Sequence, residues 1–112
     1  MKLVGLAALG VVASIAFAAP ASAEIDTDFA NELHTYGIYG PRDRNAWIGK
    51  LTCKRLYKGV DHDAQQSVNF VSKNLDKGIT TEQSWQFVGT AINYYCPDQR
   101  PVMERAAAQS AR

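Results

Sequence analysis

Residues 80–97 read TTEQSWQFVGTAINYYCP, and this stretch predicts an α-helix that ends at Cys96. Thr80 and Gln83 have the spacing of a capping box, in which each side chain accepts a hydrogen bond from a free backbone N–H of the first turn. Pro97 cannot continue the helix because it lacks a backbone N–H. Large apolar residues recur at helical intervals in between, namely Trp85, Val88, Ile92 and Tyr95.

Three shorter helical patterns precede this segment, over residues 26–37, 43–59 and 63–78. Each begins at an aspartate that could cap a helix and ends at a glycine. The third is the clearest, with apolar residues at intervals of four, three and four: Ala64, Val68, Val71 and Leu75. No useful β-type alternation occurs. The sequence therefore predicts an all-α fold, a small bundle of about four short helices.

The two cysteines, Cys53 and Cys96, are expected to form one disulfide. Closing a loop of about 44 residues would remove unfolded-state entropy worth about 4 kcal/mol, which favours a structural bridge. A redox-active pair would normally have Cys-x-x-Cys spacing, and a zinc site would need further ligands at suitable spacing. The bridge is expected to join the second helix to the end of the fourth.

Residues 1–23 have the features of a secretory signal peptide: Lys2, an apolar run to Ala19, Pro20, and small residues at the end. Cleavage is expected after Ala23. The alternative is an uncleaved membrane anchor, because the run approaches the length of a spanning helix. The mature protein is thus expected outside the cytoplasm, without a transmembrane segment, either secreted or in the cell envelope.

The mature chain divides into a helical, disulfide-stapled domain over residues 24–97 and a flexible C-terminal tail over residues 98–112. The tail is expected to fray because it is rich in alanine and offers little surface to bury. Without Lys2 the chain has 11 basic and 11 acidic side chains. That balance argues against a nucleic-acid partner, which a basic surface would attract.

The sequence has no recognisable catalytic motif, so an enzyme is not expected. His34 has no evident base or nucleophile beside it. Asp61, His62 and Asp63 are adjacent rather than at a chelating spacing, so no metal is expected. A small cell-wall hydrolase remains a less favoured reading, because it would need two acidic side chains to converge across a cleft; the candidates are Glu24, Glu32, Glu82 and Glu104.

The most distinctive surface feature is a basic run in the second helix. Lys50, Lys54 and Lys58 recur every four residues and would form a positive stripe on one face. Such a stripe could contact anionic lipid, polysaccharide or an acidic protein, although a simple solvated face is the alternative reading. The leading expectation is a non-enzymatic binding module without a bound cofactor.

An alternative expectation is a carrier of haem or of a small apolar ligand. Trp85 and Tyr95 would line a site between the helices. For haem, Tyr57 and His62 are the conceivable iron ligands, since both residue types ligate haem iron in other proteins.

Several short motifs along the chain form a familiar pattern. They are the Ala-x-Ala signal, Tyr36-Gly37-Ile38, Ile48, Cys53-x-x-Leu56-x-x-Gly59, Phe87-Val88 and Ala91-Ile92-x-x-Tyr95-Cys96-Pro97. With these motifs the sequence resembles a mycobacterial family of small secreted proteins, a domain of unknown function, over about residues 25–97. The resemblance implies a helical exported domain with one disulfide, at Cys53 and Cys96, and it brings no catalytic residues.

Overall fold

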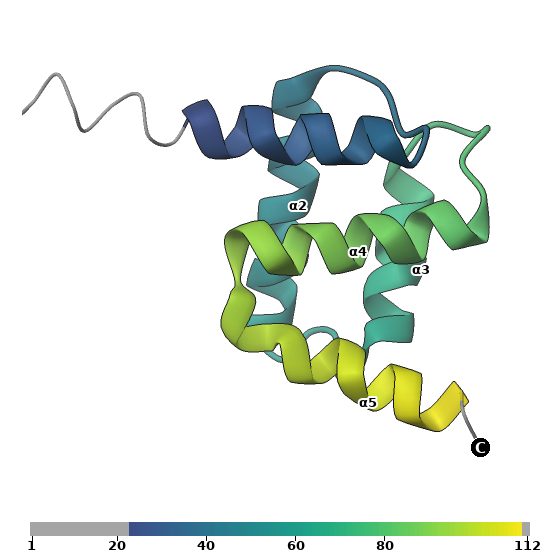
Figure 1. Ribbon diagram of the computed structural model, residues 1–112. Helices are drawn as coiled ribbons and strands as arrows, with labels where there is room; N and C mark the ends of the chain where they lie inside the picture. Colours follow the sequence, from purple (N-terminus) through teal and green to yellow (C-terminus); the bar gives the residue numbers. More distant parts are fainter. Residues whose placement is uncertain (1–22, 111–112) are drawn as a thin grey trace, which may run out of the picture.

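The computed structural model describes residues 23–110, which are helical and contain no strand (Figure 1). The all-α class is confirmed for this part of the chain, which forms five α-helices where about four were expected. The expected signal peptide lies outside the described residues except for Ala23. The helices are a first helix over residues 23–35, α2 (Arg42–Tyr57), α3 (Ala64–Asn74), α4 (Thr81–Tyr95) and α5 (Arg100–Ser110), with a short 3₁₀ helix η1 (Pro97–Gln99) before α5.

The first helix and α4 lie side by side and run in opposite directions, with α2 and α3 crossing behind them (Figure 1). The antiparallel register follows from contacts along both helices. The Tyr95 hydroxyl donates to Asp26 at 2.7 Å near one end. Gln83 donates to the backbone carbonyl of Tyr36 at 3.0 Å at the other. Helix α4 thus occupies the centre of the fold, as its long apolar pattern predicts.

Two of the expected helix caps are confirmed. Thr80 and Gln83 form the complete capping box of α4. Asp63 accepts a hydrogen bond from the backbone N–H of Gln66 and caps α3. The caps assigned to Asp26 and Asp43 are wrong. The first helix already includes residue 23, and α2 begins after Pro41, so both aspartates lie within helical turns.

The core is formed by the apolar sides of the first four helices and the disulfide. Phe29 lies at its centre, fully buried, with its ring edge-on to those of Phe87 and Tyr95 at 5.4 and 5.1 Å. Gly49 on α2 permits this packing. A Cβ atom there would come within 3.1 Å of both the Phe29 and Tyr95 rings. Glycine therefore allows α2 to approach the other two helices closely.

The expectation of a flexible tail over residues 98–112 is wrong for residues 98–110, which form η1 and α5. Val102 is only 6% exposed, and Met103 and Ala106 pack against the core. These three side chains recur at helical spacing and give α5 a narrow apolar stripe. The sequence signal for this helix is weak, because the stripe has only two medium-sized apolar residues and one alanine. Pro101 does not prevent the helix, because proline is tolerated in the first turn.

Candidate functional site

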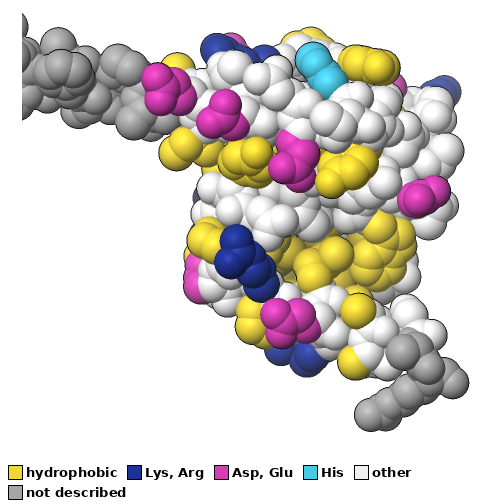
Figure 2. Space-filling view, in the orientation of Figure 1, with side chains coloured by type: hydrophobic (Ala, Val, Ile, Leu, Met, Phe, Trp, Pro, Cys, Tyr) yellow, Lys and Arg dark blue, Asp and Glu magenta, His cyan; other side chains and the backbone are white. Residues whose placement is uncertain are grey.

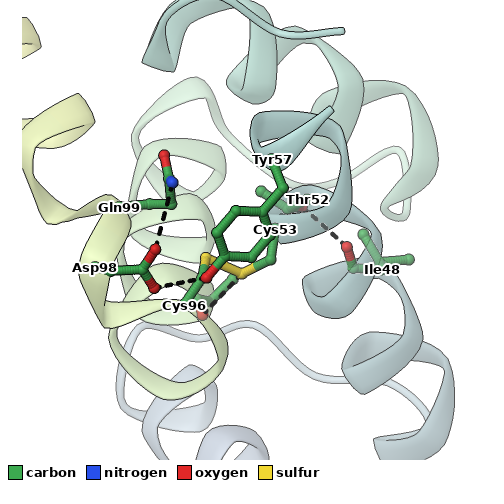
Figure 3. Close-up of a disulfide and its surroundings, with 8 residues drawn as sticks. Ile48, Thr52, Cys53, Tyr57, Cys96, Asp98 and Gln99 are labelled. Carbon is green, nitrogen blue, oxygen red and sulfur yellow. Dashed lines mark hydrogen bonds between the residues drawn. A yellow bond between two sulfur atoms is a disulfide. The ribbon is translucent and has the colours of Figure 1, made fainter. Parts of the chain in front are cut away.

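Cys53 and Cys96 form the expected disulfide, with an S–S distance of 2.05 Å (Figure 3). Both residues are buried, at 5% and 0% exposure. The bridge joins the core side of α2 to the end of α4, immediately before Pro97 turns the chain into η1. It therefore fixes the orientation of α2 and the point from which α5 departs.

A second contact strengthens this junction at the surface. The Tyr57 hydroxyl donates a 2.6 Å hydrogen bond to Asp98 on η1, close to the bridge (Figure 3). This bond raises the pKa of Tyr57 above its ordinary value and lowers that of Asp98. Tyr57 and His62 were the conceivable iron ligands of a haem carrier. In the structure the Tyr57 hydroxyl is instead hydrogen-bonded to Asp98.

The outward face of α2 carries the predicted lysine stripe. Lys50 and Lys54 on α2, and Lys58 at its C-cap, are all exposed and lie opposite the buried residues Ile48, Thr52 and Leu56. Trp47, which is 59% exposed, belongs to the same face. At 100° per residue, Trp47, Lys54 and Lys58 fall within an arc of about 40°. We call Trp47, Lys50, Lys54 and Lys58 the α2 face.

The three lysines differ in their surroundings. The ammonium group of Lys50 lies 3.4 Å from the Asp26 carboxylate and 5.5 Å from the centre of the Tyr95 ring. Among the described residues, Lys54 and Lys58 have no ion pair. Lys50 therefore helps to hold the first helix against the core, whereas Lys54 and Lys58 present uncompensated positive charge to solvent.

A groove lies between α5 and the body of the protein, with a volume of about 470 Å³. Trp85 of α4 forms part of its surface, and we call it the Trp85 groove. Its polar lining residues are His62 and Asp63, immediately before α3, Gln65 in the first turn of α3, and Arg105, Gln109 and Ser110 from α5. Hydrophobic side chains are visible between α4 and α5 in the space-filling view (Figure 2), where Trp85 also borders a smaller recess of about 180 Å³ with Met103, Ala106 and Ala107.

The groove exists because the inner side of α5 changes character along its length. Val102 is buried against the core, but the later residues on this side are Arg105, Ala106, Gln109 and Ser110. None of these four side chains is both large and apolar, so the space next to Trp85 is left open as a groove. Sequence reasoning missed Arg105 and Gln109 because the segment was expected to be a frayed tail with only a weak helical tendency. Their spacing from Val102, three and seven residues, is the helical signal that could have identified them.

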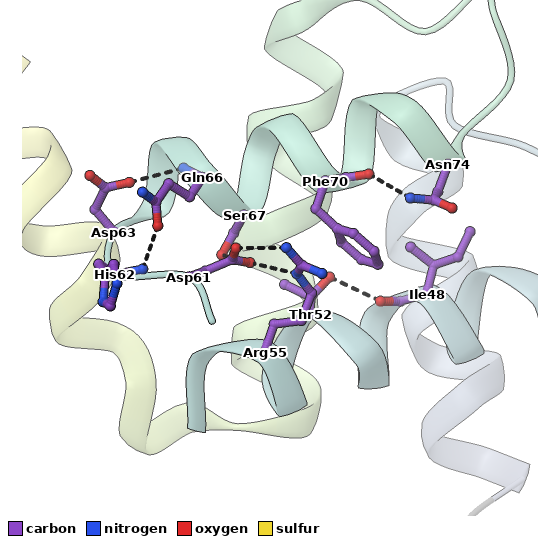
Figure 4. A network of polar contacts seen from close by, with 10 residues as sticks. All are labelled: Ile48, Thr52, Arg55, Asp61, His62, Asp63, Gln66, Ser67, Phe70 and Asn74. Carbon is purple, nitrogen blue, oxygen red and sulfur yellow. Dashed lines mark hydrogen bonds and ion pairs between the residues drawn. The ribbon is translucent and has the colours of Figure 1, made fainter. Parts of the chain in front are cut away.

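Asp61, His62 and Asp63 are adjacent in sequence, but their side chains make different contacts (Figure 4). The side chain of Asp61 is 2% exposed and accepts two hydrogen bonds from Arg55, both at 3.0 Å, and one from Ser67 at 3.1 Å. The bond with Asp61 raises the pKa of Arg55. Asp63 caps α3, and His62 is exposed at the groove. No group of three or more metal-ligating side chains occurs within residues 23–110.

The remaining catalytic candidates do not form a constellation. His34 is exposed, and its ring lies 5.1 Å from that of Tyr39. Glu32 accepts hydrogen bonds from Thr90 at 3.1 Å and Tyr94 at 3.3 Å, so it helps to dock the first helix on α4. Burial and the nearby Glu32 raise the pKa of Tyr94. The other three glutamates, Glu24, Glu82 and Glu104, are exposed.

Trp85 and Tyr95, expected to line one ligand site, line different recesses. Trp85 borders the groove beside α5. Tyr95 lies at the opposite end of α4, beside a recess of about 140 Å³ that Ile25, Asp26 and Lys50 also line. Ten residues of helix separate them by about 15 Å along the axis. Burial, followed by the hydrogen bond to Asp26, raises the pKa of Tyr95. The Tyr95 hydroxyl therefore helps to hold the first helix against α4, through its hydrogen bond to Asp26.

Comparison with known proteins identifies the relationship of the chain. Residues 25–98 match the family described as "Protein of unknown function (DUF732)". Two uncharacterized proteins of Mycobacterium tuberculosis, from strains CDC 1551 and H37Rv, are each 48% identical over 99 residues, covering 88% of both chains. No solved structure matches. The matched residues end before α5, so the family match includes one side of the Trp85 groove only. The chain belongs to the DUF732 family of proteins of unknown function.

Proposed function

We propose that the protein is an exported, non-enzymatic module that binds the anionic lipid surface of the cell envelope through the α2 face. The observation that carries this proposal is the exposure of Trp47 beside Lys54 and Lys58, two lysines without an ion-pair partner in the described chain. Tryptophan favours the membrane–water interface, where its indole is partly buried among headgroups. Lysines beside it attract anionic headgroups.

The construction of α2 supports this role. The helix places Cys53, Ile48 and Leu56 on its buried side, so the disulfide and the core hold it from behind. The α2 face is therefore rigid before it meets a partner, and binding would order little besides the side chains themselves. No helix within residues 23–110 is long and apolar enough to cross a membrane. The proposed contact is accordingly with the surface of the bilayer.

The disulfide also supports the proposed export, because such bridges persist in oxidising compartments. Cleavage after Ala23 would leave the core complete. Phe29 is the first buried residue of the described chain, and Glu24 and Ile25 are exposed. A mass spectrum of the protein secreted from a related host tests this part. A chain that starts at Glu24 and lacks two hydrogens is expected, whereas retention of residues 1–23 would overturn it.

The membrane proposal is tested with vesicles of phosphatidylcholine, with and without phosphatidylglycerol. The Trp85→Phe variant leaves Trp47 as the only tryptophan, so a blue shift of its fluorescence reports entry of the α2 face into the interface. Binding is expected only with phosphatidylglycerol and should weaken as salt is added. Replacing Lys54 and Lys58 by Gln should weaken it about thirtyfold, from about 1 kcal/mol per lysine.

A matched control removes two charges from elsewhere on the surface. Lys73 and Lys77 are exposed and lie outside α2, so replacing both by Gln changes the net charge equally. Binding that falls as much in this control as in the Lys54→Gln, Lys58→Gln variant would refute the α2 face as the contact. Binding to an anionic polysaccharide, with none to the vesicles, would refute the lipid surface as the partner.

A further inference from the structure

The lining of the Trp85 groove specifies the chemistry of a ligand. Trp85 provides one partly buried aromatic surface. Around it, the groove is bordered mainly by polar side chains whose hydrogen-bonding groups are only partly used. Within the described chain, the Trp85 indole N–H, the Arg105 guanidinium and the Gln109 amide make no hydrogen bond to another residue. Asp63 and Gln65 do, since Asp63 accepts from the backbone N–H of Gln66 and Gln65 donates to Asn69.

An apolar ligand would suit this groove poorly. A lipid chain would cover the Arg105, Gln109 and Gln65 side chains without offering them hydrogen-bond partners, and each uncompensated polar group costs free energy. Arg105 and Asp63, the one arginine and the one carboxylate in the lining, also carry opposite charges that offset each other. A strongly anionic ligand would therefore gain little net attraction. The groove selects a neutral molecule with many hydrogen-bonding groups.

The geometry points to a neutral oligosaccharide bound in the Trp85 groove. A sugar ring has an apolar face of C–H groups that can stack on the indole of Trp85 and a rim of hydroxyl groups that both donate and accept hydrogen bonds. Arg105, Gln109 and Gln65 line the same groove as the indole, where the guanidinium can donate hydrogen bonds and the two amides can both donate and accept them. The inner side of α5 from Val102 to Ser110 is about 12 Å long, which provides room for more than one ring.

This site lies apart from the α2 face. The groove is formed by α3, α4 and α5, and no residue of α2 lines it. The two sites can therefore be tested separately in the same protein, and loss of one does not imply loss of the other. Together they would hold a lipid surface and a glycan at the same time.

The test uses the full mature protein and short neutral oligosaccharides of glucose, mannose, arabinose and N-acetylglucosamine as probes. The two indole N–H signals in a proton–nitrogen NMR spectrum are assigned with Trp47→Phe. At least one oligosaccharide is expected to shift the Trp85 indole signal in a saturable manner. Gln109→Ala and Arg105→Ala, both at exposed positions, should each weaken binding about tenfold. Asn31→Ala, an exposed amide on the first helix, is the matched control.

Three outcomes would overturn the assignment. The first is the absence of a saturable shift with every oligosaccharide. The second is a shift that Gln109→Ala and Arg105→Ala leave unchanged. The third is a Trp85 shift produced by haem or by a fatty acid but by no oligosaccharide, which would make the groove a carrier site. Trp85→Leu adds a variant without the aromatic surface, and its circular dichroism spectrum shows whether the fold is retained.

Discussion

Removing the Cys53–Cys96 disulfide should destabilise the protein by about 4 kcal/mol. The cysteines are 43 residues apart, and a cross-link of that span lowers the entropy of the unfolded chain by an amount worth about 4 kcal/mol at 25 °C. Small domains have a total stability of about 5–15 kcal/mol. The loss is therefore a large share of the whole, and a domain of this size should melt about 15–30 °C lower.

The perturbation is the double variant Cys53→Ala, Cys96→Ala, which avoids placing a hydroxyl group in the core. Urea unfolding followed by circular dichroism measures the free energy of unfolding of the oxidised protein and of the variant. The dependence on urea should steepen in the variant, because its unfolded chain expands further. Thr80→Ala serves as a reference variant for the size of the effect, because loss of this helix cap should lower the free energy of unfolding by about 1 kcal/mol.

The reasoning fails if the double variant loses no more stability than Thr80→Ala. It also fails if reductant lowers the stability of the double variant as much as that of the oxidised protein, since the variant has no bridge to reduce. A loss near 4 kcal/mol with an unchanged urea dependence would refute the unfolded-state explanation. The stabilisation would then arise in the folded state.

Three further predictions concern α5, the buried ion pair and the tyrosines. Val102→Ala should cost about 2 kcal/mol and release α5, seen as faster amide hydrogen exchange in residues 100–110 and unchanged protection in α4. Asp61→Ala should cost about 2–3 kcal/mol in urea unfolding, less than for a fully buried pair because the side chain of Arg55 is 34% exposed. The pKa of Tyr95 is raised above its ordinary value of 10.0, so the unfolded chain loses the Tyr95 proton at a lower pH than the folded protein does. The free energy of unfolding should therefore keep this contribution below about pH 10 and fall as the pH rises further. Absorbance at the tyrosinate band measures the titration, and Asp26→Asn should bring the pKa of Tyr95 closer to its ordinary value.

The capping signals show where local sequence is sufficient and where it is not. Thr80 and Gln83 act within one turn of helix, so their spacing alone predicted the start of α4 correctly. Asp26 and Asp43 also have the chemistry of a cap. They do not act as caps because neighbouring residues extend each helix past them, and Pro41 supplies the start of α2.

The C-terminal segment shows that composition alone is not sufficient to predict whether a short helix forms. Its alanines suggested a tail with nothing to bury, yet Val102 and Met103 meet a surface that α3 and α4 provide. That surface is assembled from distant residues, so the sequence of the segment does not reveal it. The Trp85 groove escaped notice for the same reason, because it requires α5 to form and then to diverge from the core.

The sequence by itself determined the all-α class, the starts of α3 and α4, the disulfide between Cys53 and Cys96, and the periodic spacing of the lysines on the second helix. These features depend on residue spacing along one helix or on a pair of cysteines with a single possible partner. Only the tertiary structure decided that the side of α2 with Trp47 and the lysines is the exposed one, that Trp85 and Tyr95 line different recesses, and that α5 packs on the body. Those outcomes depend on contacts between residues far apart in the chain, which periodicity does not encode.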